Sequence, residues 1–554
     1  MKHSFQFGLR PCFTIHRNLF LLVVSAYLSL FLNAALMKRI FSSIGDLNLY
    51  NVFFIVSFFC VLILLTLAVF LIVYWPYIGK LFLLFIVITS SITNYMMYTY
   101  GIYIDQDMVR NVVNSNNHEA LDLITWSSFF WIFSTGIMPA FILGFVKIDY
   151  KPFMQEIGSR AVAIILCLVT AACLVGFFYK DIAAFGRNNR EIRNLVNTGN
   201  YLRATYKYIA NTYSVSPVFR VVDSAVQHAP FEDEGVTLLV IVVGETARAA
   251  NFSLNGYERK TNPQLEKLDV ISFKEATSCG TATAFSLPCM FSHLPRRGFD
   301  VDAEKHTENL VDLIQNSDFS VLWKDNNDGC KGVCNRIPTV DLRTLPNPEL
   351  CGNGTCFDEY HVSGLRDYVR SLKKDSVLIL HTLGSHGPTY YKRYPDKFKK
   401  FLPSCDTADI QNCSKEEIRN TYDNTILYTD HVISEVVNVL KEFPKVEAGM
   451  IYVSDHGESL GENNIYLHGM PYMIAPREQT HIPFIIWMSE RMKKDDHINY
   501  ECLREKAENE AVSHDHLYHS ILSLLEIESE TYDKSHDLFR SCRLNTAAER
   551  SFIP

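Results

Sequence analysis

The sequence begins with five long apolar runs, which constrain the fold more than any other feature. Each run holds about 20 residues, enough for an α-helix to cross the hydrocarbon core of a bilayer. We expect no cleaved signal peptide, because the first run is long and further runs follow it. With five spans, the two ends of the chain lie on opposite sides of the membrane. The runs are approximately Asn18–Met37, Asn51–Trp75, Lys80–Tyr100, Ile124–Val146 and Ala161–Tyr179.

The distribution of lysine and arginine predicts the orientation of the spans. Short cytoplasmic loops carry more positive charge than short loops on the other side of a membrane. Here the N-terminal segment and every second loop hold seven basic residues, whereas the two loops between them hold three. The N-terminus is therefore expected in the cytoplasm, and everything after Tyr179 outside it. The seven are Lys2, Arg10, Arg17, Lys80, Lys147, Lys151 and Arg160, and the three are Lys38, Arg39 and Arg110.

Cysteine usage after residue 278 points to the same side of the membrane. Ten of the 14 cysteines lie there, and eight of these ten form close sequence pairs, which leaves Cys502 to pair with Cys542. Close pairing in an even-numbered set favours disulfides and an oxidising compartment. A zinc knuckle is the alternative, but the spacings are irregular and no histidine interleaves the pairs suitably. The other expected disulfides are Cys279–Cys289, Cys330–Cys334, Cys351–Cys356 and Cys405–Cys413.

The part of the chain after the spans has the pattern of a soluble α/β protein. Residues 180–234 are polar, with Tyr, Phe and Arg near helical spacing, which predicts a helical connector partly on the membrane surface. Val236–Val243 is an unbroken β-branched and leucine run, typical of a strand buried on both faces of a parallel sheet. Ser376–Leu380 and Met450–Ser454 follow the same plan, with helical stretches between them. We expect a transmembrane part over residues 1–179, the connector over 180–234 and a doubly wound α/β domain over 235–554.

Charge and one polar loop bear on the partners of the protein. The net charge of −8 argues against nucleic acid as a partner. The loop over residues 101–123 is polar and is expected on the same side of the membrane as the soluble domain. It is either an ordinary connection between two spans or a lid that helps to bind a lipid head group.

Polar side chains follow each of the three expected strands. Glu245 follows the first strand, His386 lies after the second, and Asp455 and His456 follow the third. Singly, Glu245 could cap a helix, the others could be turn residues, and His468 could be a packed core residue. In open parallel sheets, however, ligands gather at the carboxyl ends of the strands. Carboxylates and imidazoles brought to one edge therefore favour a metal site for zinc or manganese.

The stretch Ser278–Cys289 holds a candidate nucleophile. Cys279 and Cys289 bracket a run of small hydroxyl residues, followed by an apolar segment that predicts the start of a helix. A threonine at a helix N-terminus lies among unpaired backbone N–H groups, which attract phosphate oxygens. Thr283 could therefore attack phosphorus if a neighbouring group lowers the pKa of its hydroxyl. The simpler alternative is an N-capping threonine in a rigid loop.

Taken together, these motifs resemble those of the lipid A phosphoethanolamine transferases, membrane-anchored enzymes of the alkaline phosphatase/sulfatase superfamily. The resemblance covers essentially the whole chain, including the five spans and the cysteine pattern. It implies a membrane domain of five transmembrane helices and a periplasmic α/β domain with a mostly parallel, alkaline phosphatase-like sheet. The matching motifs are Val243–Arg248, Asn251–Tyr257, Ser278–Thr283, Ser385–Pro388 and Ser454–Asn463.

The resemblance also implies an activity and its cofactor. One zinc ion is expected, with a second allowed. Thr283 is expected to take phosphoethanolamine from phosphatidylethanolamine and pass it to a phosphate of lipid A, at the periplasmic side of a bacterial inner membrane. The resemblance implies a monomer that modifies the outer membrane and confers resistance to polymyxin and cationic antimicrobial peptides. The implied zinc ligands are Glu245, Thr283, Asp455 and His456.

Two further groups of site residues follow from the same resemblance. The first group is expected to contact the substrate phosphate, and the histidines in it could instead shuttle protons or hold the second metal. The second group is expected to bind lipid on the membrane side. The groups are Lys331, His386, His468 and Asn327, and Tyr100, Asn111, Ser115 and Glu119.

Three other functions remain as alternatives. A phosphoethanolamine or phosphoglycerol transferase acting on another periplasmic glycolipid or glycan would have the same spans and threonine. A sulfatase would carry a Cys/Ser-x-Pro-x-Arg pattern, which is absent at the nucleophile. A receptor with a degenerate enzyme fold would lack at least one metal ligand, whereas all four candidates are present.

Overall fold

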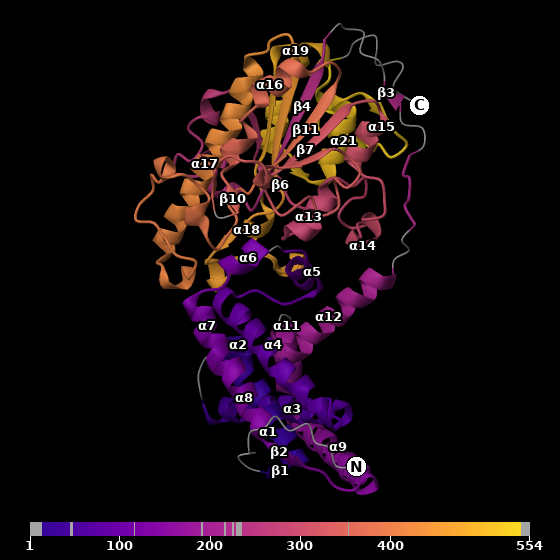
Figure 1. Ribbon diagram of the computed structural model, residues 1–554, viewed down its shortest axis with the longest axis vertical. Helices are drawn as coiled ribbons and strands as arrows, with labels where there is room; N and C mark the ends of the chain where they lie inside the picture. The colour runs from indigo at the N-terminus through magenta and orange to yellow at the C-terminus, as the bar shows by residue number, and fades with distance from the viewer. Residues whose placement is uncertain are drawn as a thin grey trace. The chain divides into compact units, whose positions relative to one another are not determined.

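The computed structural model contains two compact units, each built from two stretches of sequence (Figure 1). The first unit holds residues 1–106 and 124–207, and the second holds residues 107–123 and 208–554. The described residues are 14–44, 48–115, 117–189, 192–214, 218–223, 227–228, 235–352 and 354–544.

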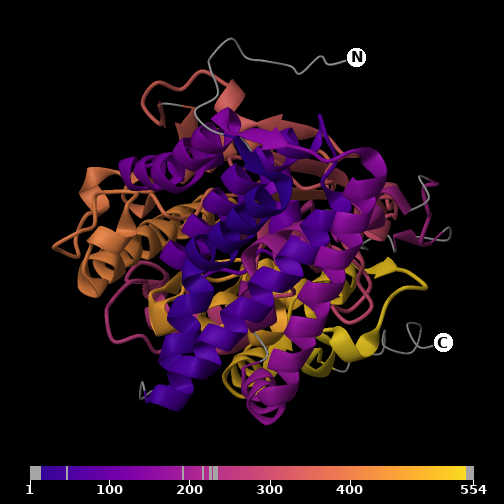
Figure 2. The ribbon, with the colours of Figure 1, turned by 90° about the horizontal axis from the view of Figure 1, so that it is seen from below.

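Five helical segments of the first unit are long and apolar enough to cross a membrane, as the sequence predicts. Their mean hydropathy lies between 1.6 and 3.1 over an 18-residue window. The second span packs against both the fifth and the first, and Figure 2 shows these indigo and violet helices alongside one another. The spans are Arg17–Ile44, Leu49–Val73 (α3), Gly79–Tyr100 (α4), Trp126–Phe145 and Phe153–Phe177 (α9).

Two of the spans are interrupted helices. In the first span, Leu32 leaves the helical conformation, with φ −97° and ψ 20°. Nearby polar side chains bind the backbone there: the Asn33 amide donates to the Leu28 carbonyl at 2.7 Å, and Asn94 Oδ1 accepts from the Ala34 N–H at 3.0 Å. Such partners matter because lipid cannot satisfy a freed backbone group. The pieces are α1 (Arg17–Leu30), Phe31–Asn33 and α2 (Ala34–Ile44) in the first span, and α7 (Trp126–Ile132), a π-helical turn over Phe133–Ile137 and α8 (Met138–Phe145) in the fourth.

The fifth span begins earlier than the apolar pattern indicates. Its helix starts at Phe153 rather than near Ala161, so it includes Glu156 and Arg160. Glu156 forms an ion pair with Arg17 of the first span. The Arg160 guanidinium donates to two backbone carbonyls at the end of α3. Tertiary partners that the local sequence does not reveal therefore allow charged residues inside this helix.

The second unit is built around a seven-stranded mixed sheet with the order β5-β15-β12-β4-β11-β7-β8. The strands from β12 to β8 are parallel, whereas β15 is antiparallel to both β12 and β5. The three strands predicted from the sequence are confirmed as adjacent strands, and they are buried along their whole length. The strands are β4 (Thr237–Gly244), β5 (Ile271–Phe273), β7 (Ser320–Asp325), β8 (Thr339–Asp341), β11 (Ser376–His381), β12 (Glu447–Ser454) and β15 (Phe484–Met488).

The register of the parallel strands aligns their carboxyl ends. Val243 of β4 pairs with Val453 of β12 on one side and with His381 of β11 on the other. The residues that directly follow these strands therefore meet at one edge of the sheet. Figure 1 shows α16 and α17 on one side of the strands and α15 and α21 on the other. These helices are α15 (Leu310–Asn316), α16 (Leu365–Ser371), α17 (Lys415–Lys441) and α21 (Asp515–Leu524).

Helices occupy most of the described part of the expected connector. They are α10 (Tyr179–Asn188), α11 (Ile192–Leu195) and α12 (Asn197–Ser214). The boundary between the two compact units falls within α12, after residue 207. The functional division at residues 179 and 234 stays a prediction.

Five disulfides join the ten cysteines of the second unit, and they are the five predicted pairs. They are Cys279–Cys289, Cys330–Cys334, Cys351–Cys356, Cys405–Cys413 and Cys502–Cys542. Of the earlier cysteines that the structure describes, Cys60, Cys167 and Cys173 are free thiols.

Residues 107–123, which we call the strap, belong to the second unit although membrane spans precede and follow them. The strap contains most of α5 (Gln106–Asn114) and all of α6 (Asn117–Asp122). Arg110 Nη2 donates to Asp302 Oδ2 at 2.7 Å, and both side chains are buried. At the other end of the strap, the Asp122 carboxylate accepts three hydrogen bonds. Their donors are Thr389 Oγ1 at 2.7 Å, Lys392 Nζ at 2.7 Å and Arg393 Nη2 at 3.0 Å.

Candidate active site

Three elements of the second unit bring four predicted site residues together. Glu245 directly follows β4, and Asp455 and His456 directly follow β12. Thr283 is the first residue of α13 (Thr283–Met290). All four residues are buried. The structure therefore assembles, at the carboxyl edge of the sheet, the ligand set that the resemblance implies.

The distances within this cluster are close to those of a metal site. His456 Nε2 lies 3.4 Å from Glu245 Oε1 and 3.4 Å from Asp455 Oδ2. Thr283 Oγ1 lies 3.0 Å from Glu245 Oε2 and 3.3 Å from His456 Nε2. Tetrahedral ligands about 2.0–2.1 Å from zinc are separated by about 3.3 Å. The four distances given above, between 3.0 and 3.4 Å, are close to this separation.

Unsatisfied polar atoms in the cluster also fit a bound cation. Glu245 Oε1 and Asp455 Oδ2 are buried and have no hydrogen-bond partner among the described residues. The His456 Nδ1–H donates to the Gly457 carbonyl at 2.9 Å, so Nε2 is the ring nitrogen that faces the two carboxylates. Buried carboxylate oxygens without donors are costly unless a cation neutralises them. The carboxylate, imidazole and hydroxyl donors suit zinc.

The charged side chains of the cluster shift one another's pKa values. Burial and the charge of Glu245 raise the pKa of Asp455 to about 6. Burial lowers the pKa of His456, but the two carboxylates outweigh burial and raise it to about 10. The protein alone therefore holds a proton where the carboxylates crowd together, and a metal ion can replace it.

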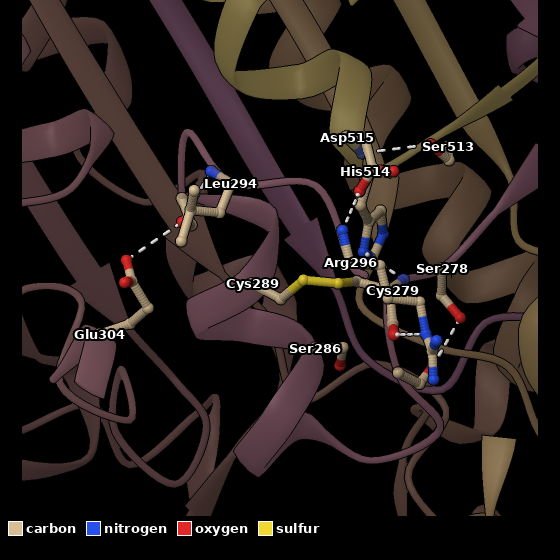
Figure 3. The surroundings of a disulfide bond; sticks show 12 residues. Ser278, Cys279, Ser286, Cys289, Leu294, Arg296, Glu304, Ser513, His514 and Asp515 are labelled. Atoms are coloured by element: carbon tan, nitrogen blue, oxygen red, sulfur yellow. Dashed lines mark hydrogen bonds between the residues drawn. A yellow bond between two sulfur atoms is a disulfide. The ribbon is translucent and has the colours of Figure 1, made fainter. Parts of the chain in front are cut away.

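The loop before α13 holds Thr283 in place. The Cys279–Cys289 disulfide joins this loop to the end of the helix (Figure 3). Thr281, two residues before Thr283, is used differently, because its Oγ1 donates to the Met470 carbonyl at 2.7 Å. Only Thr283 of these two directs its hydroxyl into the cluster, as the resemblance implies.

His514 connects the nucleophile loop to the metal-binding strand, a role that the sequence analysis missed. Its Nδ1 accepts from the Cys279 N–H at 3.0 Å (Figure 3). Its Nε2–H donates to the Ser454 carbonyl at 2.9 Å. Burial lowers the pKa of His514 to about 4, so the ring is neutral at neutral pH. A lone histidine far along the chain gives no sequence signal of this bridge.

The two histidines expected at the substrate phosphate lie beside the cluster. The His468 ring centroid lies 4.4 Å from that of His456 and 5.4 Å from that of His386. His468 Nδ1 is 2.8 Å from Glu458 Oε2, and the other Glu458 oxygen accepts from the Tyr390 hydroxyl at 2.5 Å. The buried Glu458 therefore fixes the His468 ring with Nε2 free to act. The sequence analysis missed this carboxylate, although it lies only three residues after Asp455.

Asn327 contacts Glu245, one of the candidate metal ligands. Its Nδ2 donates to Glu245 Oε2 at 2.8 Å and to the Thr382 carbonyl at 2.9 Å, and it lies 3.3 Å from His381 Nε2. His381 Nδ1 is in turn 2.9 Å from Asp325 Oδ2. Asn327 therefore orients Glu245, with the Asp325–His381 pair behind it, and contact with the substrate phosphate stays a prediction.

Lys331 has both local partners and a partner in the strap. Its Nζ donates to the Asp328 carbonyl at 2.8 Å and to the Asn114 carbonyl of the strap at 3.2 Å, and it lies 3.3 Å from Asp328 Oδ2. Its backbone has a φ of 50°, an uncommon conformation for a residue with a side chain. The expected contact between Lys331 and the substrate phosphate stays a prediction.

The expected lipid-binding residues lie in both units. Tyr100 is buried at the end of α4 in the first unit, and Asn111 and Ser115 lie in the strap. Ser115 Oγ donates to the Asn111 carbonyl at 2.8 Å. Glu119 lies in α6, but its side chain is outside the described residues. A role of these four in lipid binding stays a prediction.

Comparison with known proteins agrees with this arrangement. A family model described as "Sulfatase" matches residues 237–527, and one described as "Phosphoethanolamine transferase EptA/EptB" matches residues 62–213. Phosphoethanolamine transferase EptA of Escherichia coli K12 is 39% identical over 534 residues, which cover 94% of this chain and 96% of that protein. Phosphatidylethanolamine transferase Mcr-1 of Escherichia coli is 35% identical over 477 residues, which cover 84% of this chain and 86% of that protein.

A solved structure extends the similarity to both units. It is the integral membrane protein lipooligosaccharide phosphoethanolamine transferase A of Neisseria meningitidis. The TM-score is 0.93 with 36% sequence identity, and the match covers 96% of this chain and 100% of that one. The chain therefore belongs to the lipid A phosphoethanolamine transferase family, within the alkaline phosphatase/sulfatase superfamily.

Proposed function

We propose that this protein transfers phosphoethanolamine from phosphatidylethanolamine to a phosphate of lipid A, with zinc in the site and Thr283 as the nucleophile. The observation that carries the proposal is the position of Thr283 Oγ1, buried at a helix N-terminus within 3.0 Å of Glu245 and 3.3 Å of His456. Membership of the family supports this substrate class. Related proteins are named as phosphoethanolamine transferases, and the Neisseria protein is named for lipooligosaccharide.

The side chains that would hold zinc lie together in the second unit. Glu245, Asp455 and His456 would bind the ion, with Thr283 beside them. When bound there, zinc favours the ionised form of the threonine hydroxyl and polarises a phosphoryl oxygen. Asn327 holds Glu245 through one carboxylate oxygen, so the other remains available to the ion.

The transfer takes place in two balanced steps. In the first step, Thr283 Oγ forms a bond to the donor phosphorus, and the bond from phosphorus to the diacylglycerol oxygen breaks. The threonine gives up its proton, and the departing diacylglycerol takes one up. In the second step, an oxygen of the acceptor phosphate forms a bond to phosphorus and the bond to Thr283 Oγ breaks. Thr283 Oγ then takes up a proton released by the acceptor phosphate or by water, which restores the hydroxyl.

Side chains around the cluster supply protons and charge for these steps. We assign proton transfer to His468, because Glu458 orients its ring beside His456 and leaves Nε2 free. His386 contacts the phosphate from the other side of His468. Lys331 balances the negative charge of the phosphoryl group during transfer. Tyr100, Asn111, Ser115 and Glu119 hold the lipid substrates.

The membrane setting follows from the spans and the family. The protein is a multi-pass inner-membrane enzyme with its soluble domain in the periplasm. Its N-terminus lies in the cytoplasm, and it acts as a monomer. Adding ethanolamine to a lipid A phosphate lowers the negative charge of the outer membrane, which weakens binding of polymyxin and other cationic peptides.

Trapping the covalent intermediate tests the proposed function. With phosphatidylethanolamine and no acceptor, the wild-type protein should release one diacylglycerol per active site and then stall, with phosphoethanolamine on the Thr283 peptide by mass spectrometry. Thr283→Ala should abolish transfer. The matched control is Thr281→Ala, which should still form the adduct on Thr283 because its hydroxyl binds a carbonyl outside the cluster. Normal transfer by Thr283→Ala would refute the mechanism.

A further inference from the structure

An exposed apolar turn follows the active-site segment around His468. It consists of residues 471–476, with the sequence Pro-Tyr-Met-Ile-Ala-Pro, and we call it the apolar hook. The Met473 side chain is 95% exposed and that of Ile474 is 43% exposed. Two adjacent large apolar side chains at the tip of an ordered turn have no folding role in the second unit, so they favour a partner outside it.

The apolar hook is held in place by a hydrogen bond within it and by contacts with Ser278 and Arg296. Pro471 and Pro476 close its two ends, and the Ile474 N–H donates to the Pro471 carbonyl at 2.9 Å. The Tyr472 hydroxyl donates to the Ser278 carbonyl at 2.9 Å. The Arg296 guanidinium stacks over the Tyr472 ring at 3.4 Å. The turn that carries the exposed Met473 side chain is therefore fixed by its neighbours.

One positive charge, Arg296, contacts the apolar hook, and a second, Arg297, follows it in sequence. Arg296 contacts Tyr472 and donates from Nε to the Cys279 carbonyl at 2.7 Å, both neutral groups, so these contacts leave its charge in place (Figure 3). The Asp515 carboxylate accepts from the backbone N–H of Arg296 at 3.0 Å. Arg297, the next residue, is exposed. Apolar tips flanked by arginine are the pattern of a segment that lies in a membrane interface.

The strap shows on which side of the second unit the hook lies. Met108 of the strap packs against Gly469, where its Cε atom leaves no room for a Cβ, so the strap contacts the chain two residues before the hook. Figure 1 shows α5, α6, α13 and α18 (Arg477–Thr480) at the same end of this unit. The strap continues into a membrane span within six residues on one side and two on the other. The hook thus lies at the end of the second unit that holds the strap, whose two ends lead into membrane spans.

We propose that the apolar hook, together with Arg296 and Arg297, docks on the surface of an anionic phospholipid bilayer. Met473 and Ile474 enter the interface, and the two arginines bind lipid phosphates. This contact goes beyond the transfer reaction, because it concerns the bulk membrane and not the substrate in the site.

Docking would set the height of the nucleophile above the membrane. The Gly469 N–H donates to the Thr281 carbonyl at 2.7 Å, and the Thr281 hydroxyl donates to the Met470 carbonyl at 2.7 Å. The hook and the loop that carries Thr283 are therefore one rigid piece. A membrane-bound donor would then present its phosphate at a fixed level relative to Thr283.

Depth-dependent fluorescence quenching tests the docking directly. The full-length protein, with the four cysteines before residue 180 changed to alanine, is placed in nanodiscs of phosphatidylethanolamine and phosphatidylglycerol. A nitrobenzoxadiazole label is attached at Met473→Cys or at the control Lys374→Cys, an exposed site before β11 at the opposite edge of the sheet. Lipids with a shallow nitroxide should quench the label at 473 at least twofold more than the label at 374. Equal quenching at both sites would overturn the proposal, whatever the enzyme activity.

A kinetic comparison separates docking from a merely structural role. The double variant Met473→Ser/Ile474→Ser should lose about fivefold or more in transfer from bilayer phosphatidylethanolamine, comparable to one interfacial contact. With a water-soluble short-chain donor, its rate should stay within twofold of wild type. An equal loss with both donors would mean that the hook only supports the site, and no loss with either would mean that it is not docked.

Charge reversal tests the arginine part of the contact. Arg297→Glu should reduce the rate more in vesicles that contain phosphatidylglycerol than in vesicles with phosphatidylcholine in its place. The matched control is Lys373→Glu, which reverses an exposed charge before β11. The same response to phosphatidylglycerol in both variants would overturn the role of Arg297. Absence of transfer by the wild-type protein in both kinds of vesicle would instead contradict the proposed function.

Discussion

At the scale of single residues, the sequence predicts the candidate reacting side chains but not the residues that orient them. Glu245, Asp455 and His456 could be identified because each directly follows a buried strand, and parallel strands share one edge. Thr283 could be singled out within its loop. The support behind them could not. Asn327 is predicted at the substrate phosphate and not at Glu245, and His514 joins two segments that are far apart in sequence.

Asn327 provides a test of that support. Asn327→Ala removes the hydrogen bond to Glu245 Oε2, so the carboxylate loses its fixed orientation. Loss of such a partner typically weakens metal binding 10- to 100-fold. We expect a loss in this range for zinc, measured by competition with a chelator. Asn335→Ala, at an exposed asparagine nearby in sequence, is the control. Unchanged zinc affinity in Asn327→Ala would contradict this positioning role.

At the scale of elements, the sequence predicts the runs with the strongest pattern. The five spans and the strands β4, β11 and β12 are long, continuous apolar runs, and they are confirmed. The strands β5 and β8 are three residues long, and their pairing depends on neighbours from distant parts of the chain. The packing of the strap within the second unit could not be predicted either, because the sequence of a polar loop between spans does not reveal whether the loop packs against another part of the protein.

His514 is expected to keep the nucleophile loop in register with β12. His514→Ala leaves the Cys279 N–H and the Ser454 carbonyl without their partner, at about 1–3 kcal/mol for each buried group. A displacement of about 1 Å in the loop can cost about 100-fold in rate. We therefore expect kcat to fall about 10- to 100-fold with zinc still bound.

Two further variants distinguish this register effect from simple destabilisation. His516→Ala, on the same helix but without a contact to the loop, should stay within twofold of wild type. His514→Gln can both accept and donate a hydrogen bond, so it should recover part of the rate. An alanine variant with normal kcat would show that the bridge is dispensable.

At the scale of the whole molecule, buried carboxyl groups make stability depend on pH. Asp430 on α17 is buried and accepts from the backbone N–H groups of Gln264 and Leu265. Burial raises the pKa of Asp430 from 3.8 to about 7. A carboxyl group with a raised folded-state pKa stabilises the fold fully below pH 3.8, and this contribution is lost as the pH rises to about 7. The second unit should therefore gain stability from this group in mild acid.

Asp430→Asn removes this titration. The variant loses one hydrogen bond at every pH, but it no longer places a charge in the core above pH 7. Its free energy of unfolding relative to wild type should increase by about 2 kcal/mol between pH 5 and pH 7.5. Midpoints of thermal unfolding in detergent measure this difference as an upward shift of several degrees. Asp367→Asn, at an exposed carboxylate, should give a difference that does not change with pH.

The strap can also be supplied as a synthetic peptide that binds the second unit. A protein that starts at residue 208 keeps Asp302, Lys392 and Arg393 but lacks Arg110 and Asp122, which pair with them. A synthetic peptide of residues 107–123 should bind this fragment, measured by fluorescence anisotropy, and a peptide with Asp122→Asn should bind more weakly. The full-length protein should not bind it, because its own strap competes at an effective concentration of about millimolar. Equal binding to both proteins would contradict this competition. The strap thus offers a template for inhibitors that compete with a part of the enzyme itself rather than with its lipid substrates.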